Sequence, residues 1–168
     1  MTRWLISGLA AAVVMTACGA PEEPSATLPQ LSATGLEPII DPPATPPRWY
    51  KFEQVTQGKR LYVEHCASCH GRHGEGSADW RRRGPDGKLP PPPLIGTGHT
   101  WHHPLAILYR VIMHGSPGGQ GNMPAWKDKL SRDEALSVIA WFQSRWPDKI
   151  YEAGYVRDLQ ARADAAGQ

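Results

Sequence analysis

The chain contains 168 residues, carries a formal net charge of +2 and includes 17 glycines, 17 prolines and three cysteines. This length suits one domain with a modest hydrophobic core. The net charge is too small to indicate a protein that binds nucleic acid, so we expect no nucleic-acid partner. The prolines and glycines are unevenly distributed and divide the chain into segments of different character.

Residues 1–17 have the features of a lipoprotein-type signal peptide. Arg3 supplies a positive charge, and residues 4–14 form an apolar run that is short for a membrane span but suits a signal-peptide core. The run ends in MTAC, which resembles a bacterial lipobox, so we expect Cys18 to carry a lipid that anchors the protein to a membrane. A plain secretory signal and an uncleaved anchor are the alternatives. All three place the rest of the chain outside the cytoplasm, in the periplasm or on the outer face of the bacterial cell membrane.

Residues 18–48 are interpreted as the lipidated cysteine followed by a proline-rich linker. Eight of the 30 residues from 19 to 48 are proline, and the segment has no periodic hydrophobicity. A coil of this length would span on the order of 30 Å. The linker would therefore keep a globular domain near a membrane but away from its surface.

Three segments show the apolar periodicity of helices, namely residues 53–70, 104–115 and 130–147. In the third, Ser131 and Glu134 have the spacing of a capping box, and a proline marks its end. The first and third segments are expected to pack against each other. The predicted fold is therefore all-α, with three helices and long connections.

The first helical segment ends in HCASCHG, which places Cys66, Cys69 and His70 in a C-x-x-C-H motif. A structural zinc site needs four ligands, usually as two pairs, and no second C-x-x-C occurs. A redox-active dithiol would accompany a βαβ pattern, which is not evident. In a c-type haem site, each cysteine forms a thioether with one vinyl group and the histidine is the proximal iron ligand. We predict one covalently bound haem c, with zinc binding and dithiol chemistry kept as alternatives.

The connection at residues 71–103 is long for a small domain and has no clear element of its own. It contains five glycines before Lys88 and the run PPPP. A haem accounts for such a connection, because it supplies a large apolar core around which loops can wrap.

Four stretches in order, GKRLYVEHCASCHG, PPLIG, GNMPAW and LSRDEALSVIAWFQSRWP, resemble a class I bacterial cytochrome c. The resemblance covers roughly residues 50–150. It implies an all-α cytochrome c fold at residues 49–150, with three or more helices and long loops wrapped around one covalent haem. It also implies that the first and last helices cross near Gly58 and Tyr62.

The resemblance also implies further haem-binding residues. A proline carbonyl in the family's P-x-L element accepts a hydrogen bond from the proximal imidazole, which corresponds here to Pro92 and Leu94, with the neighbouring prolines left open. The family's axial methionine corresponds to Met123, in the same M-P context and 53 residues after His70. We expect Trp126 to lie at the haem edge or in the core.

The residues themselves also favour Met123 as the sixth iron ligand. It lies in a glycine-rich loop, whereas Met113 lies inside an apolar helix, where packing explains it better. Histidine is the rival ligand, either His114 or one of the GHTWHH group, which could instead gather around zinc or copper. The histidines of that group are His99, His102 and His103.

The function expected from these features is electron transfer by a membrane-tethered monohaem cytochrome c, not catalysis. Its partners would be a redox protein donor and acceptor, and its His/Met-ligated iron would cycle between two oxidation states. The alternatives are a haem subunit of a larger oxidoreductase, and a small haem enzyme or sensor with an open sixth site. Residues 151–168, with few apolar side chains, are expected to form a frayed tail that haem binding does not need.

Overall fold

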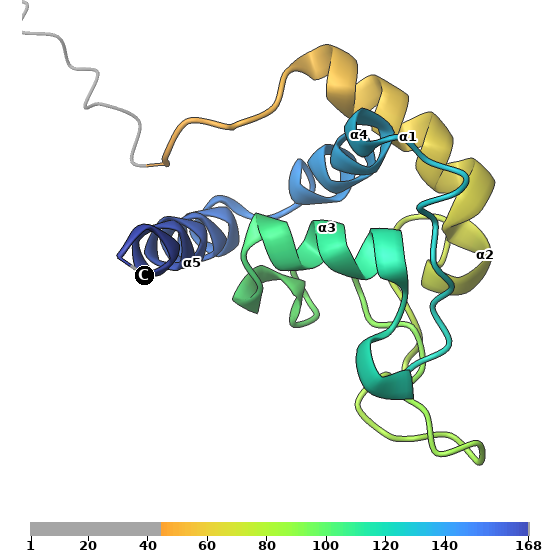
Figure 1. Ribbon diagram of the computed structural model, residues 1–168. Helices are drawn as coiled ribbons and strands as arrows, with labels where there is room; N and C mark the ends of the chain where they lie inside the picture. The colour runs from red at the N-terminus through yellow and green to blue at the C-terminus, as the bar shows by residue number, and fades with distance from the viewer. Residues whose placement is uncertain (1–44, 168) are drawn as a thin grey trace, which may run out of the picture. The chain divides into compact units, whose positions relative to one another are not determined.

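The computed structural model describes residues 45–167, and this part of the chain is helical. It contains no strand within these residues, only one isolated parallel bridge between Leu89 and Gly121. The predicted all-α class is confirmed (Figure 1). The elements are, in chain order, α1 (Phe52–His65), α2 (Ala67–His70), the 3-10 turn η2 (Thr100–His102), α3 (Leu105–His114), the 3-10 turn η3 (Pro117–Gly119), α4 (Arg132–Gln143) and α5 (Asp148–Ala166).

The signal peptide, Cys18 and most of the linker at 18–48 lie outside the described residues. Among residues 45–167, no helix is both long enough and apolar enough to cross a membrane.

The closest helix contact is the crossing of α1 and α4, as expected from the sequence. A side chain on Gly58 would overlap the backbone carbonyl of Ser137, so the crossing requires the absence of a Cβ there. This close approach accounts for a glycine that costs a helix about 1 kcal/mol relative to alanine. One turn further along, the ring of Tyr62 packs on that of Trp141, with ring centroids 3.9 Å apart.

The predicted capping box at the start of α4 is present. The Ser131 hydroxyl accepts a hydrogen bond from the Glu134 backbone N–H at 3.3 Å, and the Glu134 carboxylate accepts one from the Ser131 N–H at 2.9 Å. The helix ends at Gln143, four residues before the expected end at Pro147. Trp146, between these two positions, is buried, and its indole N–H donates to the Leu94 carbonyl at 2.7 Å. This contact accompanies the departure of the chain from the helix before Pro147.

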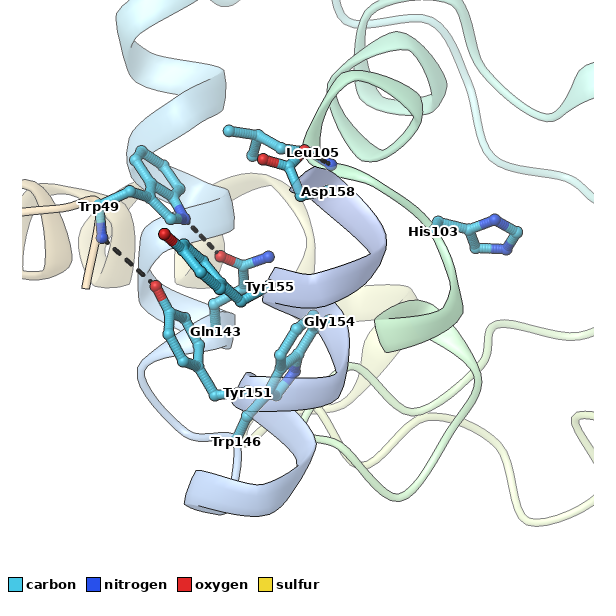
Figure 2. Close-up of a pocket in the computed structure, with 9 residues that line it drawn as sticks. All are labelled: Trp49, His103, Leu105, Gln143, Trp146, Tyr151, Gly154, Tyr155 and Asp158. Carbon is cyan, nitrogen blue, oxygen red and sulfur yellow. Dashed lines mark hydrogen bonds between the residues drawn. The ribbon is translucent and has the colours of Figure 1, made fainter. Parts of the chain in front are cut away.

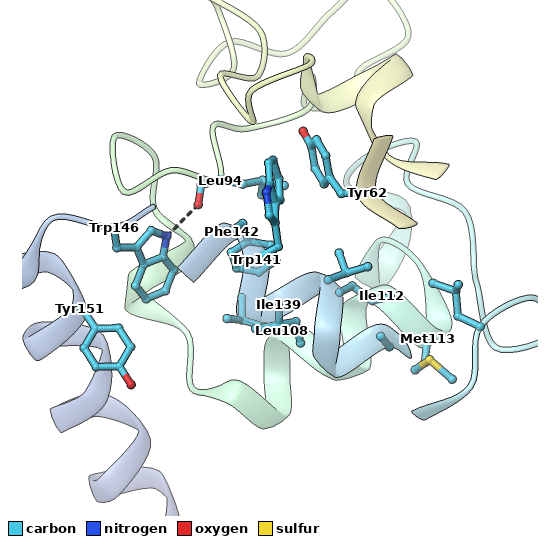
Figure 3. Packing of buried hydrophobic residues seen from close by; sticks show 13 residues of the cluster. Tyr62, Leu94, Leu108, Ile112, Met113, Ile139, Trp141, Phe142, Trp146 and Tyr151 are labelled. Atoms are coloured by element: carbon cyan, nitrogen blue, oxygen red, sulfur yellow. Dashed lines mark hydrogen bonds between the residues drawn. The ribbon is translucent and has the colours of Figure 1, made fainter. Parts of the chain in front are cut away.

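The hydrophobic core forms around α4, which packs against α1 and α3 (Figure 3). Met113 belongs to this core, in agreement with the packing role expected from its position in an apolar helix. The largest contributions come from the buried aromatic side chains, which are Tyr62, Trp141, Phe142, Trp146 and Tyr151.

Residues 151–166 differ from the frayed tail expected from the sequence. They continue α5, which begins at Asp148 and crosses the expected domain boundary at residue 150. Tyr151 is only 2% exposed. Gly154 lies so close to the Trp146 ring that a Cβ there would be 2.8 Å from it. The sequence did not indicate this helix because separate contacts, such as those of Tyr151, Gly154 and Asp158, attach it instead of a continuous apolar stripe.

Helix α5 also forms hydrogen bonds with residues 47–49, which precede α1 (Figure 2). The Tyr151 hydroxyl accepts from the Trp49 backbone N–H and donates to the Pro47 carbonyl, both at 3.3 Å. The Trp49 indole donates to the Gln143 side chain at 2.6 Å. The cavity between these groups has a volume of about 20 Å³, enough for one water molecule, and is therefore a packing feature rather than a ligand site.

We expect Tyr151→Ala to lower the free energy of unfolding by about 3 kcal/mol, because it removes a buried ring and leaves a cavity. Val156→Ala, on the exposed side of the same helix (56% exposed), should change it by less than about 0.5 kcal/mol. Urea unfolding of the full chain measures both values. Equal effects of the two substitutions would mean that α5 is not attached as the structure has it.

Candidate haem site

The end of α1 places the two cysteines and the histidine of the C-x-x-C-H motif within one helical turn. Cys66 joins α1 to α2, and its carbonyl accepts from the N–H groups of Cys69 at 3.2 Å and His70 at 3.0 Å. The Cys66 side chain is partly buried and that of Cys69 is exposed. Three side chains from a single turn can reach one ring edge and the metal at its centre.

The electrostatic setting of the thiols does not suit a dithiol oxidoreductase. Burial, with a smaller contribution from neighbouring Cys69, raises the pKa of the Cys66 thiol to about 11. Catalytic thiols of such enzymes have a lowered pKa, because the thiolate is the nucleophile. The raised pKa of Cys66 therefore speaks against disulfide exchange at this motif.

The imidazole of His70 is buried and held in one orientation. Its Nδ1 lies 3.0 Å from the Pro92 carbonyl oxygen, and because a carbonyl can only accept, Nδ1 must carry the proton. The lone pair of Nε2 is then free to bind a metal. Burial lowers the pKa of His70, with the hydrogen bond to Pro92 opposing this shift, so the ring is in the neutral form that a metal ligand requires.

The Pro92 carbonyl is placed by backbone contacts between residues 71–77 and 91–94. The N–H of Ser77 donates to the Pro91 carbonyl at 2.9 Å, and the N–H of Leu94 donates to the Gly74 carbonyl at 2.7 Å. Any side chain on Gly76 would overlap the backbone of Pro92 and Pro93. This glycine therefore permits the close approach that brings the carbonyl to His70.

Tyr62 connects this loop to the helix crossing. Its hydroxyl donates to the Gly71 carbonyl at 2.6 Å, directly after the motif, while its ring lies on Trp141. Burial, the largest cause, raises the pKa of the Tyr62 hydroxyl far above its usual value, so this donor stays protonated at any physiological pH. The orientation of the C-x-x-C-H turn is thus tied to the α1–α4 core.

Met123 lies in a loop whose two ends, at Ser116 and Met123, are joined by hydrogen bonds. Its backbone N–H donates to the Ser116 hydroxyl at 3.1 Å, and its carbonyl accepts from the Ser116 N–H at 3.0 Å. Three residues later, the Trp126 N–H donates to the Ile112 carbonyl at 3.1 Å, which fastens the loop to the end of α3. The Met123 side chain is partly buried against the core.

The methionine loop lies beside the C-x-x-C-H motif. The ring of Trp126 contacts that of His65, the last residue of α1, with centroids 5.1 Å apart. Cys66, Met123 and Trp126 all pack against the same core. The structure thus brings together residues that lie far apart in the sequence.

The GHTWHH histidines do not converge on a common point. The His99 ring stacks on Trp80 with centroids 5.2 Å apart and meets the edge of His103, while His102 stacks on Trp101. Within residues 45–167, no three His, Cys, Asp or Glu side chains form a group that could hold a metal ion. The structure therefore gives the zinc or copper alternative no support. The rival sixth ligand His114 is the exposed last residue of α3.

A haem fits these residues in its donor chemistry. Two thiols and an oriented imidazole occupy one turn, and a thioether lies in an adjoining loop. Imidazole and thioether are the axial pair of electron-transferring cytochromes c. The site would be built from Cys66, Cys69, His70, Met123 and the loop that carries Pro92.

Some residues that shape the site were not singled out from the sequence. Gly76 and Ser116 act through backbone geometry, and Asn122 acts through contacts to residues 34 and 36 positions away. The glycine spacing in HGRHGEG was the one local signal, since a turn after the motif needs such residues.

We expect the double substitution Cys66→Ser with Cys69→Ser to abolish covalent haem attachment, because serine cannot form the thioether bonds. Haem staining after denaturing electrophoresis measures this. Cys18→Ser is the matched control, since it removes the third cysteine and should leave the stained band intact. A stained band from the double variant would refute the assignment of these two residues.

Two curated proteins resemble part of this chain. The cbb3-type cytochrome c oxidase subunit CcoP of Azospirillum brasilense is 31% identical over 84 residues, which are 50% of this chain and 25% of that protein. The CcoP subunit of Azospirillum sp. (strain B510) is 32% identical over 87 residues, which are 52% of this chain and 27% of that protein. The chain thus matches about a quarter of the length of each relative.

A family model described as cytochrome C oxidase, cbb3-type, subunit III matches residues 53–142, more than half of the chain. The matched region contains the C-x-x-C-H turn, the Pro92 loop, the methionine loop and α4 up to Phe142. The fold, the donor set and this match agree, and the chain belongs to the cytochrome c family of cbb3-type oxidase subunit III.

Proposed function

We propose that this protein is a membrane-tethered monohaem cytochrome c that carries electrons outside the cytoplasm. The observation that carries the proposal is the hydrogen bond from His70 Nδ1 to the Pro92 carbonyl. It fixes a buried, neutral imidazole with Nε2 free, one residue after Cys69. A partner carbonyl of this kind is what a metal-binding histidine needs to keep its tautomer and direction.

In this proposal, Cys66 and Cys69 hold the haem covalently, and His70 and Met123 are its axial ligands. When bound, the haem supplies one iron that changes reversibly between the ferrous and ferric states. A thioether favours the ferrous state and raises the reduction potential. With a protein side chain assigned to each axial position, the chain is better suited to electron transfer than to binding a substrate at the metal.

The tether in this proposal is a lipid on Cys18 followed by the proline-rich segment up to residue 48. The lipobox-like MTAC sequence supports it. Such a tether would keep the cytochrome close to redox proteins of the same membrane, which raises the effective concentration of the partners.

A second function is favoured by the named relatives. Both are subunits of cbb3-type cytochrome c oxidase, so this chain could act as the haem subunit of a larger oxidoreductase and pass electrons to another subunit. The chemistry of the chain would be the same in both cases. Copurification from detergent-solubilised membranes separates them, because a subunit would elute with stable protein partners and a free carrier would elute alone.

We expect Met123→Ala to open the sixth coordination position. The reduced variant should bind carbon monoxide, whereas the wild type should not, and the reduction potential should fall because the thioether is lost. Visible spectra with and without carbon monoxide, and a redox titration, measure the two effects. Met113→Ala is the control, since it should leave both properties near those of the wild type and instead cost about 2–5 kcal/mol of stability.

An unchanged spectrum and potential in Met123→Ala would contradict the ligand assignment. In that case a histidine such as His114 would hold the iron, and the wild type would have the lower potential of a bis-histidine haem. The haem attachment itself would remain supported by the staining experiment.

We expect Cys18→Ser to release the protein from membranes, because it removes the proposed site of lipidation. Fractionation of cells into membrane and soluble parts, with haem staining of each, measures this. A variant that stays with the membrane after loss of its leader would exclude Cys18 as the anchor.

A further inference from the structure

We propose that Asn122 is a positioning residue that keeps Met123 at the iron by fastening the methionine loop to the loop before Pro92. The inference rests on the proposed function, since it takes Met123 as the sixth ligand. It assigns a role to three polar side chains, Asp86, Lys88 and Asn122, which we call the Asn122 clasp.

The clasp joins two loops that are far apart in the sequence. The Asn122 side-chain oxygen accepts from the Lys88 ammonium at 2.7 Å, and its amide N–H donates to the Asp86 carboxylate at 2.9 Å. The other Asp86 oxygen accepts from the Lys88 backbone N–H at 3.0 Å. An ammonium can only donate a hydrogen bond and a carboxylate can only accept one. The Asn122 amide must therefore point its oxygen toward Lys88 and its nitrogen toward Asp86, which allows a single orientation of the side chain.

Backbone contacts beside the clasp connect the same two loops. The Leu89 N–H donates to the Gln120 carbonyl at 2.8 Å, and Leu89 forms the isolated parallel bridge with Gly121. Asn122 directly precedes Met123, and Leu89 lies three residues before Pro92. The clasp therefore links the segment that leads to the partner of His70 with the segment that leads to the thioether.

The methionine loop needs a restraint on this side. Ser116 holds Met123 at the base of the loop. Between them, Gly118 and Gly119 both have positive φ, and a Cβ on either would meet no atom within 4 Å. These residues stiffen the loop little. Contacts from the 86–89 segment therefore add to the hydrogen bonds of Ser116 and Trp126 in opposing movement of Met123.

The clasp is exposed to solvent. Its loss should therefore affect the position of Met123 more than the free energy of unfolding of the domain. Exposed polar pairs contribute little to the free energy of unfolding, with a median below about 1 kcal/mol. A loop with soft glycines, however, responds to the loss of a restraint by local opening. Removal of the clasp should open the sixth position without unfolding the domain.

The test is imidazole binding to the oxidised, haem-loaded full chain, followed by visible absorption. Asn122→Ala should bind imidazole about fivefold more tightly than the wild type, as expected for the loss of a hydrogen-bonded restraint of ordinary strength. Its thermal unfolding midpoint should stay within a few degrees of the wild type. Met123→Ala gives the reference for a fully open site.

Two matched variants control this measurement. Arg82→Ala removes an ion pair to Asp79 of 2.8 Å within a single loop, so it should bind imidazole as the wild type does. The double variant Asp86→Asn with Asn122→Asp exchanges the amide and the carboxylate and restores the donor–acceptor pattern, so its imidazole affinity should return toward the wild-type value.

Three outcomes would overturn the inference, and they are distinguishable. If Asn122→Ala binds imidazole as the wild type does while Met123→Ala opens the site, Asn122 has no positioning role and the ligand assignment stands. If tighter binding comes with a large loss of thermal stability and no rescue by the exchange, the effect is general destabilisation. If the wild type binds imidazole as tightly as Met123→Ala, the ligand assignment itself is wrong, and the positioning role falls with it.

Discussion

The hydrogen bond between His70 Nδ1 and the Pro92 carbonyl is the contact on which the candidate site depends. It selects the tautomer of a buried imidazole and sets the direction of Nε2. The carbonyl reaches the ring only because Gly76 lets two loop segments approach without a side chain between them. A side chain at position 76 would displace this carbonyl and so alter the orientation of His70 without changing His70 itself.

The helices form the core of this domain, and the loops supply most of the remaining groups of the candidate site. The α1–α4 crossing, with Tyr62 on Trp141, forms a core and orients the C-x-x-C-H turn through the hydrogen bond of Tyr62 to Gly71. The loops supply the remaining groups, and each is tied to this core by a few specific contacts, such as that of Trp146 with Leu94. Long loops are tolerated in so small a domain because their ends are fixed in this way.

The same loops define what the protein can do. In the proposed electron carrier, both axial ligands would have to stay in place during the change of iron charge, so restraint of the methionine loop would matter as much as the identity of its methionine. The attachment of residues 47–49 to α5 sets where the proposed tether would leave the domain.

The sequence by itself determined the local features: the C-x-x-C-H turn, the capping box at Ser131 and the apolar helices, because each depends on residues within one or two turns of the chain. The resemblance to a cytochrome c pointed to Pro92 as the partner of His70 and left the neighbouring prolines open. The tertiary structure decided on Pro92, because only the packing of residues 71–77 against 91–94 selects one carbonyl. The sequence also missed the attachment of α5, whose few contacts reach residues about 100 positions earlier, and the Asn122 clasp, whose partners are 34 and 36 positions away. Contacts of that range leave no periodic pattern in a sequence, so they could be recognised only when the folded chain had brought their partners together.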